Sequence, residues 1–298
     1  MENRKLLQAG LKRPKKLKSD KPFLYTERTF VYIFLILLTI LCLFPFWILL
    51  VNATRSNADI KNSFSLWFGG SLAQNWNGLR GNDHIPTRTA LANSIWISFV
   101  SAILTVYFSA LTAYAIHIYN FRGKKFIAAF ILAIRMIPTQ VSAMGLVRIC
   151  AKRGLYNQIW LIIVPAICTP SVYFYRKQYL ESVLPYEIVE ASRVDGASEL
   201  RTFHQIVLPI LKPAISVQFI FAFVASWNNY FRPAMLLKDS SVRTIPLIIA
   251  NLKNSDPSVF DLGQIYLLMA IAVFPMLIIY LVFSRGILKN LTAGSVKG

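Results

Sequence analysis

Charged residues are scarce in this chain, and acidic residues are the scarcest among them. Only 15% of its 298 residues are charged, against about 25% in an ordinary soluble domain, and 13 Asp and Glu stand against 32 Lys and Arg. Three cysteines are too few for a disulfide-stapled secreted fold. The 55% share of apolar residues excludes a disordered chain and does not suit a basic nucleic-acid-binding domain. A membrane protein with several spans and basic loops accounts for both the apolar composition and the net charge of +19.

Long apolar runs dominate the chain, and six of them approach or exceed the roughly 20 residues that cross a bilayer. Because these runs are continuous rather than alternating, they predict helices and not barrel strands. The first run follows nine Lys and Arg, as in a signal peptide, but it is longer than the core of about 7–15 residues that such a peptide has. The predicted spans are residues 29–51, 90–119, 126–147, 159–175, 214–234 and 264–284.

The basic residues orient these predicted spans. Twenty of the 32 lie in the tail 1–28, the turn 120–125, the loop 176–213 and the tail 285–298, whereas eleven lie in the opposite connections and Arg135 lies inside a span. Since the more basic side of a membrane protein faces the cytoplasm, we expect both termini and the 176–213 loop to be cytoplasmic.

Residues that would let the chain supply its own energy or chemistry are missing. No Asp or Glu lies in the six predicted spans, although ion-coupled transporters commonly use carboxylates there. The sequence has no G-x-x-x-x-G-K-[ST] loop for a nucleotide, no Cys/His cluster with metal-ligand spacing, and three histidines in separate segments. An ion-coupled secondary transporter and a membrane enzyme therefore remain only as alternatives, and uphill transport would draw its energy from a partner.

Five of the thirteen acidic residues lie in the predicted cytoplasmic loop. Within it, the segment 185–210 predicts two short amphipathic helices at an angle. Pro185 opens the first helix, Gly196 forms the turn, Ser198 caps the second helix, and Pro209 ends it before the next span. From these residues alone, a docking element for another protein and a hairpin on the membrane surface are equally good interpretations.

The same loop resembles the EAA signature of permeases from binding-protein-dependent ABC importers. The matching residues are Glu190-Ala191-Ser192, then Gly196 after three residues, and Ile206-x-Leu208-Pro209 after nine more. Ser192 departs from the family pattern, in which alanine is usual, but a small side chain should not block docking. Further motifs resemble the maltose-type short permease over residues 28–298: Trp227-Asn228 with Pro233, Met136-Ile137-Pro138-x-Gln140, Gly154-Leu155-Tyr156-Asn157, and the ending 291–298.

The resemblance implies an all-α polytopic fold of the type I ABC importer permease, with six transmembrane helices and cytoplasmic coupling helices. It implies a basic tail 1–28, a first helix and periplasmic loop at 29–88, a core at 89–284 containing the EAA loop 185–210, and a tail 285–298. The implied partners are a paralogous permease, two ATPase subunits that hold ATP and Mg²⁺, and a solute-binding protein outside the bacterial inner membrane. The chain itself would bind no cofactor, metal or nucleic acid, and its basic tail would contact lipid.

In this family the EAA loop docks on the ATPase, so the resemblance assigns ATPase coupling to Glu190, Ala191, Ser192, Asp195, Gly196, Ile206, Leu208 and Pro209. The last two residues of the tail, Lys297 and Gly298, would reach between the ATPase subunits.

Polar and aromatic residues of the fifth predicted span suit a sugar, since rings stack on aromatic faces and hydroxyls pair with amides. Packing between helices and anchoring at the interface is the alternative. The candidate pathway residues are Gln218, Trp227, Asn228, Asn229 and Tyr230.

Arg135 has no carboxylate partner in any predicted span, and a charge inside a bilayer is expected to be functional. Arg148 would lie about three and a half turns farther along the same helix. We therefore expect an electropositive pathway and an anionic cargo, such as a uronate-rich oligosaccharide of the alginate kind. The alternatives are that Arg135 pairs with an acid of the partner permease or with backbone carbonyls, and that the cargo is a neutral sugar.

Overall fold

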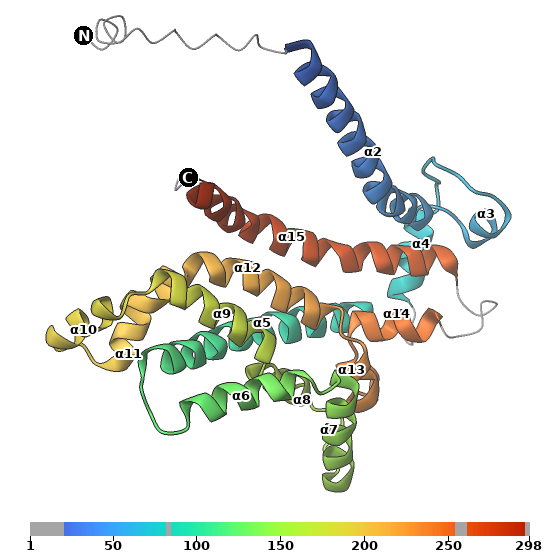
Figure 1. Ribbon diagram of the computed structural model, residues 1–298. Coiled ribbons are helices and arrows are strands. Elements are labelled where there is room, and N and C mark those ends of the chain that lie inside the picture. Colours follow the sequence, from blue (N-terminus) through green and yellow to red (C-terminus); the bar gives the residue numbers. More distant parts are fainter. Residues whose placement is uncertain (1–20, 82–84, 254–260, 296–298) are drawn as a thin grey trace, which may run out of the picture. The chain divides into compact units, whose positions relative to one another are not determined.

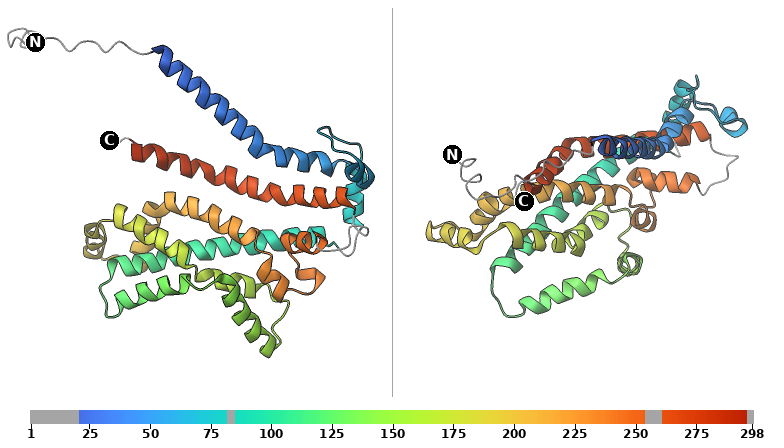
Figure 2. Two further views of the ribbon diagram at one scale, coloured as in Figure 1. Left: turned by 45° about the vertical axis from the view of Figure 1, so that its right-hand side comes forward. Right: turned by 45° about the horizontal axis from the view of Figure 1, so that its top comes forward.

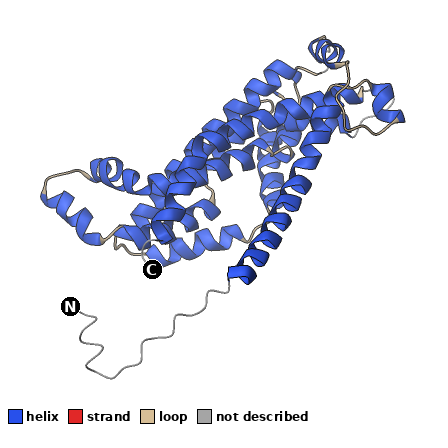
Figure 3. Ribbon diagram, turned by 90° about the horizontal axis from the view of Figure 1, so that it is seen from above, coloured by secondary structure: helices blue, strands red, loops and turns tan. Residues whose placement is uncertain are grey.

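The computed structural model describes residues 21–81, 85–253 and 261–295, and it describes side chains for residues 28–81, 85–252 and 261–284. Within those ranges the chain consists of helices joined by turns, without a strand, which confirms the predicted all-α class (Figure 3). The chain divides into two units, Met1–Ile48 and Leu49–Gly298. Helix α2, Lys21–Ala53, makes up the described part of the first unit, and its side chains there are exposed and mainly apolar, as a lipid-facing span requires.

The second unit is a bundle around α5, Thr87–Ile118. Helices α9 (Pro170–Val183) and α12 (Leu208–Trp227) pack against α5, and α15 (Leu262–Ser295) packs against α12, as the views in Figures 1 and 2 show. The buried face of α5 carries mainly small side chains, which allow such close approach between membrane helices. These small residues are Ala90, Ser94, Ser98, Ser101, Ala102, Thr105, Ser109, Ala110 and Ala113.

Shorter helices connect and flank this bundle. They are α3 (Asn57–Asn62), α4 (Leu72–Arg80), α6 (Lys124–Arg135), α7 (Thr139–Arg153), α8 (Trp160–Ile163), the 3₁₀ turn η1 (Val164–Ile167), α10 (Tyr186–Val194), α11 (Glu199–Thr202), the π-turn η2 (Phe203–Val207), α13 (Phe231–Leu236), the 3₁₀ turn η3 (Ser240–Val242) and α14 (Ile245–Lys253).

Four helices in the described part of the chain are long and apolar enough to cross a membrane, and they coincide with the first, second, fifth and sixth predicted spans. The third predicted span is wrong as a single helix, because α6 and α7 meet at 94°. Pro138 lies at this bend, where its ring disfavours a helical conformation for Ile137 and leaves no N–H to continue the ladder. Arg148 therefore does not continue along the axis of the helix that carries Arg135.

The fourth predicted span is interrupted, into α8, η1 and α9. By length and composition the described residues contain four candidate spans, or five if the bent pair counts as one, so the predicted number of six is not confirmed. Pro170 has no N–H to give to the carbonyl of Ala166, four residues earlier. The hydroxyls of Thr105 and Thr169 donate to that carbonyl instead, each at 2.8 Å. Side-chain donors of this kind make a broken helix tolerable at membrane depth.

The segment after Pro185 folds into α10, a turn in which Gly196 has φ +78°, and α11, as its local signals predict. Ser198 caps α11 by accepting a hydrogen bond from the Arg201 N–H. The predicted end of this helix at Pro209 is wrong, because α11, η2 and α12 form one continuous helix. In the π-turn η2 the Leu208 N–H bonds the carbonyl of Phe203 five residues back, and this widened turn accommodates the proline ring that follows.

Candidate functional site

The hairpin of α10 and α11 is held together by a buried hydroxyl pair. Ser192 Oγ lies 2.9 Å from Thr202 Oγ1 and donates to the carbonyl of Val189 at 2.8 Å. Ser192 is 5% exposed and Thr202 is 1% exposed. Ser192, the one departure from the usual EAA pattern, thus acts as a tie between the two helices, a bond that an alanine at this position lacks.

A second tie joins the hairpin to the end of α5. The carboxylate of Glu199 accepts from Arg193 Nε at 2.8 Å and from the Tyr114 hydroxyl at 3.2 Å. The Arg193 guanidinium also lies over the ring of Tyr119, 5.6 Å from its centroid. The hydrogen bond to Glu199 raises the pKa of Arg193, so the ion pair persists at physiological pH. A displacement of α10 would therefore be transmitted to α5 through Glu199, a residue to which sequence reasoning assigned no role.

The outer surface of the hairpin is exposed and partly apolar. Glu190 is exposed, and the side chains of Val194 and Leu200 are 87% and 63% exposed. Three further predicted coupling residues, Ala191, Asp195 and Gly196, are exposed on the same hairpin. The remaining predicted coupling residues, Ile206, Leu208 and Pro209, lie farther along the continuous helix that begins with α11. Lys297 and Gly298 lie outside the described residues.

The predicted sugar-binding residues are divided between the core and the surface. Trp227 is 2% exposed and stacks on Phe223 with ring centroids 5.8 Å apart, so it packs in the core of the bundle. Asn228 and Tyr230 are exposed beyond the end of α12, and Asn229 is half-buried there.

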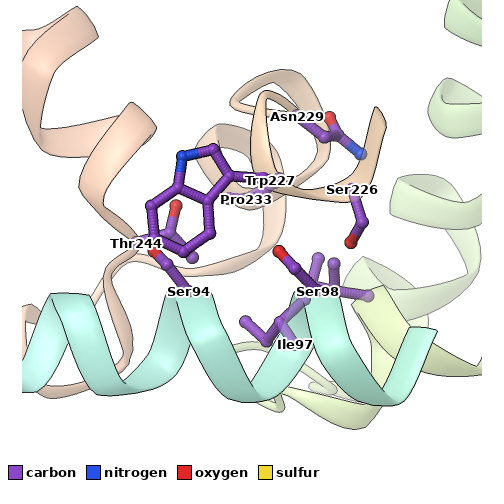
Figure 4. Close-up of a pocket in the computed structure, with 9 residues that line it drawn as sticks. Ser94, Ile97, Ser98, Ser226, Trp227, Asn229, Pro233 and Thr244 are labelled. Carbon is purple, nitrogen blue, oxygen red and sulfur yellow. The ribbon is translucent and has the colours of Figure 1, made fainter. Parts of the chain in front are cut away.

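A small pocket adjoins this region, and the side chains of Ser94, Ser98, Ser226 and Trp227 are among those that line it (Figure 4). The space inside it that is free for solvent is only about 10 Å³, roughly what one water molecule needs, so in this conformation the pocket is closed to a sugar. The lining residues are Ser94, Ile97, Ser98, Ile162, Ser226, Trp227, Asn229, Pro233 and Thr244.

Arg135 and Arg148 are not brought to this pocket. Both side chains are exposed, Arg135 at the end of α6 and Arg148 on α7, on opposite sides of the 94° bend. No residue of α6 is buried, and apart from the side that packs on α9 with the half-buried Ile131, this helix is open to lipid or to another subunit.

The charge that lies inside the bundle is Arg176, which the sequence assigned to a cytoplasmic loop. Arg176 is fully buried on α9 and donates from Nε to Gln218 Oε1 on α12 at 2.8 Å. The signal that could have located it is the spacing of Tyr173, Arg176 and Leu180, which share one face of a helix and are all buried. Among the described residues, no group of three His, Cys, Asp or Glu could hold a metal ion.

The Ser192–Thr202 bond gives a testable consequence for the hairpin. Ser192→Ala leaves the Thr202 hydroxyl buried without this partner, which should lower stability by about 1–3 kcal/mol, whereas the pair Ser192→Ala with Thr202→Val should be nearly neutral. Hydrogen exchange of the backbone amides in α10 and α11 measures the difference. Equal amide protection in the single and double variants would contradict the proposed tie.

The sequence is similar to those of known transport proteins. Residues 108–291 match the family described as binding-protein-dependent transport system inner membrane component. The arabinooligosaccharides transport system permease protein AraQ of Halalkalibacterium halodurans is 33% identical over 70% of this chain and 74% of its own length. The trehalose/maltose transport system permease protein MalG of Thermococcus litoralis is 29% identical over 91% and 98%.

A solved bacterial ABC transporter involved in the import of the acidic polysaccharide alginate has the same fold, with a TM-score of 0.72 at 19% identity over 92% of this chain and 99% of its own. The long family match and the relative at 33% identity agree with the helical membrane architecture. The chain therefore belongs to the family of binding-protein-dependent transport system inner membrane components, as a permease of the carbohydrate ABC importer type.

Proposed function

We propose that this multi-pass inner-membrane permease passes an acidic oligosaccharide into the cell, driven by ATP hydrolysis on partner subunits that dock on the α10–α11 hairpin. The carbohydrate importer role rests on the family match over residues 108–291, which spans the hairpin and most of the bundle. A permease of this kind is not an enzyme, because the ATPase activity of the complex lies in other subunits. ATP and Mg²⁺ would accordingly be held by two ATPase partners.

The hairpin is suited to transmit force from an ATPase. Glu190 offers a free carboxylate for a basic residue of the partner, while Val194 and Leu200 offer exposed apolar surface beside it. Because Glu199 ties the hairpin to α5, a movement of the docked ATPase would reach the helix around which the bundle is packed. The same proposal places both termini in the cytoplasm. It also places Lys297 and Gly298 between the ATPase subunits.

A second permease chain and a solute-binding protein complete the proposed complex. The surface of α6, exposed along its length with aromatic side chains such as Phe126 and Phe130, suits a paralogous permease as partner. Cargo would arrive from an extracytoplasmic binding protein, as the description of the family suggests. A solved relative in fold has been captured with an alginate pentasaccharide-bound periplasmic protein, at a TM-score of 0.55.

Charge favours an acidic cargo over a neutral one. The predicted spans contain Arg135 but no Asp or Glu, and Arg176, just beyond the fourth of them, is buried without a carboxylate partner among the described residues. Both alginate transporters in the structural comparison handle an acidic polysaccharide, and the sn-glycerol-3-phosphate transport system permease protein UgpE of Yersinia pestis, 27% identical over 88% of this chain and 95% of its own length, is named for an anionic solute. A neutral oligosaccharide is the second candidate, favoured by the name of the 33% identical arabinooligosaccharide permease.

Glu190→Lys tests the docking role of the hairpin. Reversal of this exposed charge should prevent the ATPase subunit from co-purifying with the permease and should abolish ATP-driven uptake, because like charges would meet at the interface. Glu181→Lys is the matched control, since it reverses an exposed charge on α9 and disrupts only a surface ion pair with Lys177. Normal co-purification and uptake in the Glu190 variant would refute docking through this residue.

Arg135→Gln tests the acidic cargo. If Arg135 attracts an anionic cargo, uptake of a uronate oligosaccharide should fall by about tenfold while uptake of its carboxyl-reduced, neutral counterpart stays within about twofold. Arg122→Gln removes an equally exposed arginine from the turn before α6 and should leave both rates unchanged. Equal losses for the two sugars would place Arg135 in assembly with the partner permease instead.

A further inference from the structure

Arg176 has more hydrogen-bond donors than the bundle satisfies. Its guanidinium carries five N–H groups, and only the one on Nε is bonded, to Gln218 Oε1 at 2.8 Å. The nitrogens Nη1 and Nη2 have no partner, and neither has the amide nitrogen of Gln218. Since arginine can only donate, the Gln218 amide must turn its oxygen to Nε and its NH₂ group away. Four guanidinium N–H groups and two amide N–H groups thus have no acceptor between α9 and α12.

No carboxylate in the described part of the chain pairs with this charge. The ion pairs found among the described residues are Lys177–Glu181 and Arg193–Glu199, and neither includes Arg176. A partner subunit cannot reach the guanidinium across an outer surface, because Arg176 has 0% exposure and Gln218 has 5% within this single chain. The arrangement is therefore a buried positive charge with unfilled donors on both side chains.

Loss of the proton does not resolve this arrangement, because a guanidinium stays charged in proteins. A buried charge without a counter-charge is strongly unfavourable, and the usual remedy is an ion pair with hydrogen bonds to the remaining donors. The planar fork of Nη1 and Nη2 matches the two oxygens of a carboxylate, and an amide NH₂ beside it adds a further donor.

We propose that Arg176 and Gln218 form an anion-binding site between α9 and α12. Its ligand is a group with one negative charge, either a carboxylate of the cargo or a small inorganic anion such as chloride. If the ligand is a carboxylate of the cargo, the site depends on the proposed import of an acidic oligosaccharide. The carboxylate then enters when α9 and α12 separate during transport. The inorganic source requires no such opening and would make the anion a fixed part of the bundle.

The site is tested by the thermal unfolding of the purified importer complex in sodium chloride or sodium acetate, with sodium isethionate keeping the ionic strength constant. An anion that binds only the folded state should raise the unfolding midpoint by about 2–4 °C between 1 and 100 mM. Arg122→Gln, which removes an exposed arginine, should keep this rise. Arg176→Gln should lose it, and an unchanged rise in that variant, or no rise in the unsubstituted protein, would overturn the site.

Gln218→Glu keeps the test decisive if Arg176→Gln fails to assemble. This substitution places a carboxylate at the position that already accepts from Arg176 Nε, so it supplies the missing counter-charge. The complex should then unfold at a higher temperature in isethionate alone and should no longer respond to chloride or acetate. A response equal to that of the unsubstituted protein would contradict the proposal.

Uptake by proteoliposomes separates the two anion sources. If the cargo carboxylate uses the site, Gln218→Glu should lower uptake of a uronate trisaccharide by about tenfold and leave uptake of its carboxyl-reduced derivative within about twofold. Unchanged uptake of both sugars, with the anion response of unfolding lost, would assign the site to an inorganic ion. Absence of uronate uptake in the unsubstituted complex would contradict only the acidic-cargo function, because the unfolding measurement involves no transport.

Discussion

The close packing of α9 and α12 against the small side chains of α5 is the constraint on which the bundle depends. Between helices in lipid, association relies on close van der Waals contact and on hydrogen bonds rather than on the hydrophobic effect. Ser98, Ala102 and Thr105 permit that contact on the buried face of α5. The Thr105 hydroxyl also donates to the carbonyl of Ala166, which Pro170 leaves without an N–H donor. The face of α5 against which the neighbouring helices pack therefore also stabilises the broken segment before α9.

The packing around α5 also explains how the α10–α11 hairpin can influence the bundle. The end of α5 holds Glu199 through Tyr114, and Ser192 holds α10 to α11 through Thr202. The hairpin is thus tied to the bundle by side-chain hydrogen bonds on its inner side. An element that is tied on its inner side and exposed on its outer side suits the transmission of a partner's movement to the bundle.

The apolar runs of the sequence were sufficient to predict the all-helical class and the four long spans, because length and hydropathy determine which segments can cross a bilayer. The apolar runs did not show where the helices break, because Pro138 ends a helix whereas Pro209 lies within a continuous one. The difference arises from the π-turn before Pro209, which depends on backbone geometry that no local pattern reveals.

Local sequence patterns also did not reveal which arginine is buried in the bundle. Arg135 attracted attention because it interrupts an apolar run, yet it is exposed on α6, while Arg176 just beyond a predicted span is fully buried. The local signals at Pro185, Gly196 and Ser198 predicted the helix–turn–helix element correctly. The ties through Glu199 and Ser192 could not be predicted in this way, because they depend on contacts across ten or more residues.

The central claim is that the hairpin docks on an ATPase and does not lie on the membrane surface. A photoreactive amino acid in place of Val194, whose side chain is 87% exposed at the tip of α10, tests this claim most directly in intact membranes. Docking predicts a crosslink to the ATPase subunit whose yield changes when ATP is added. Crosslinks to lipid alone, with or without ATP, would contradict the account.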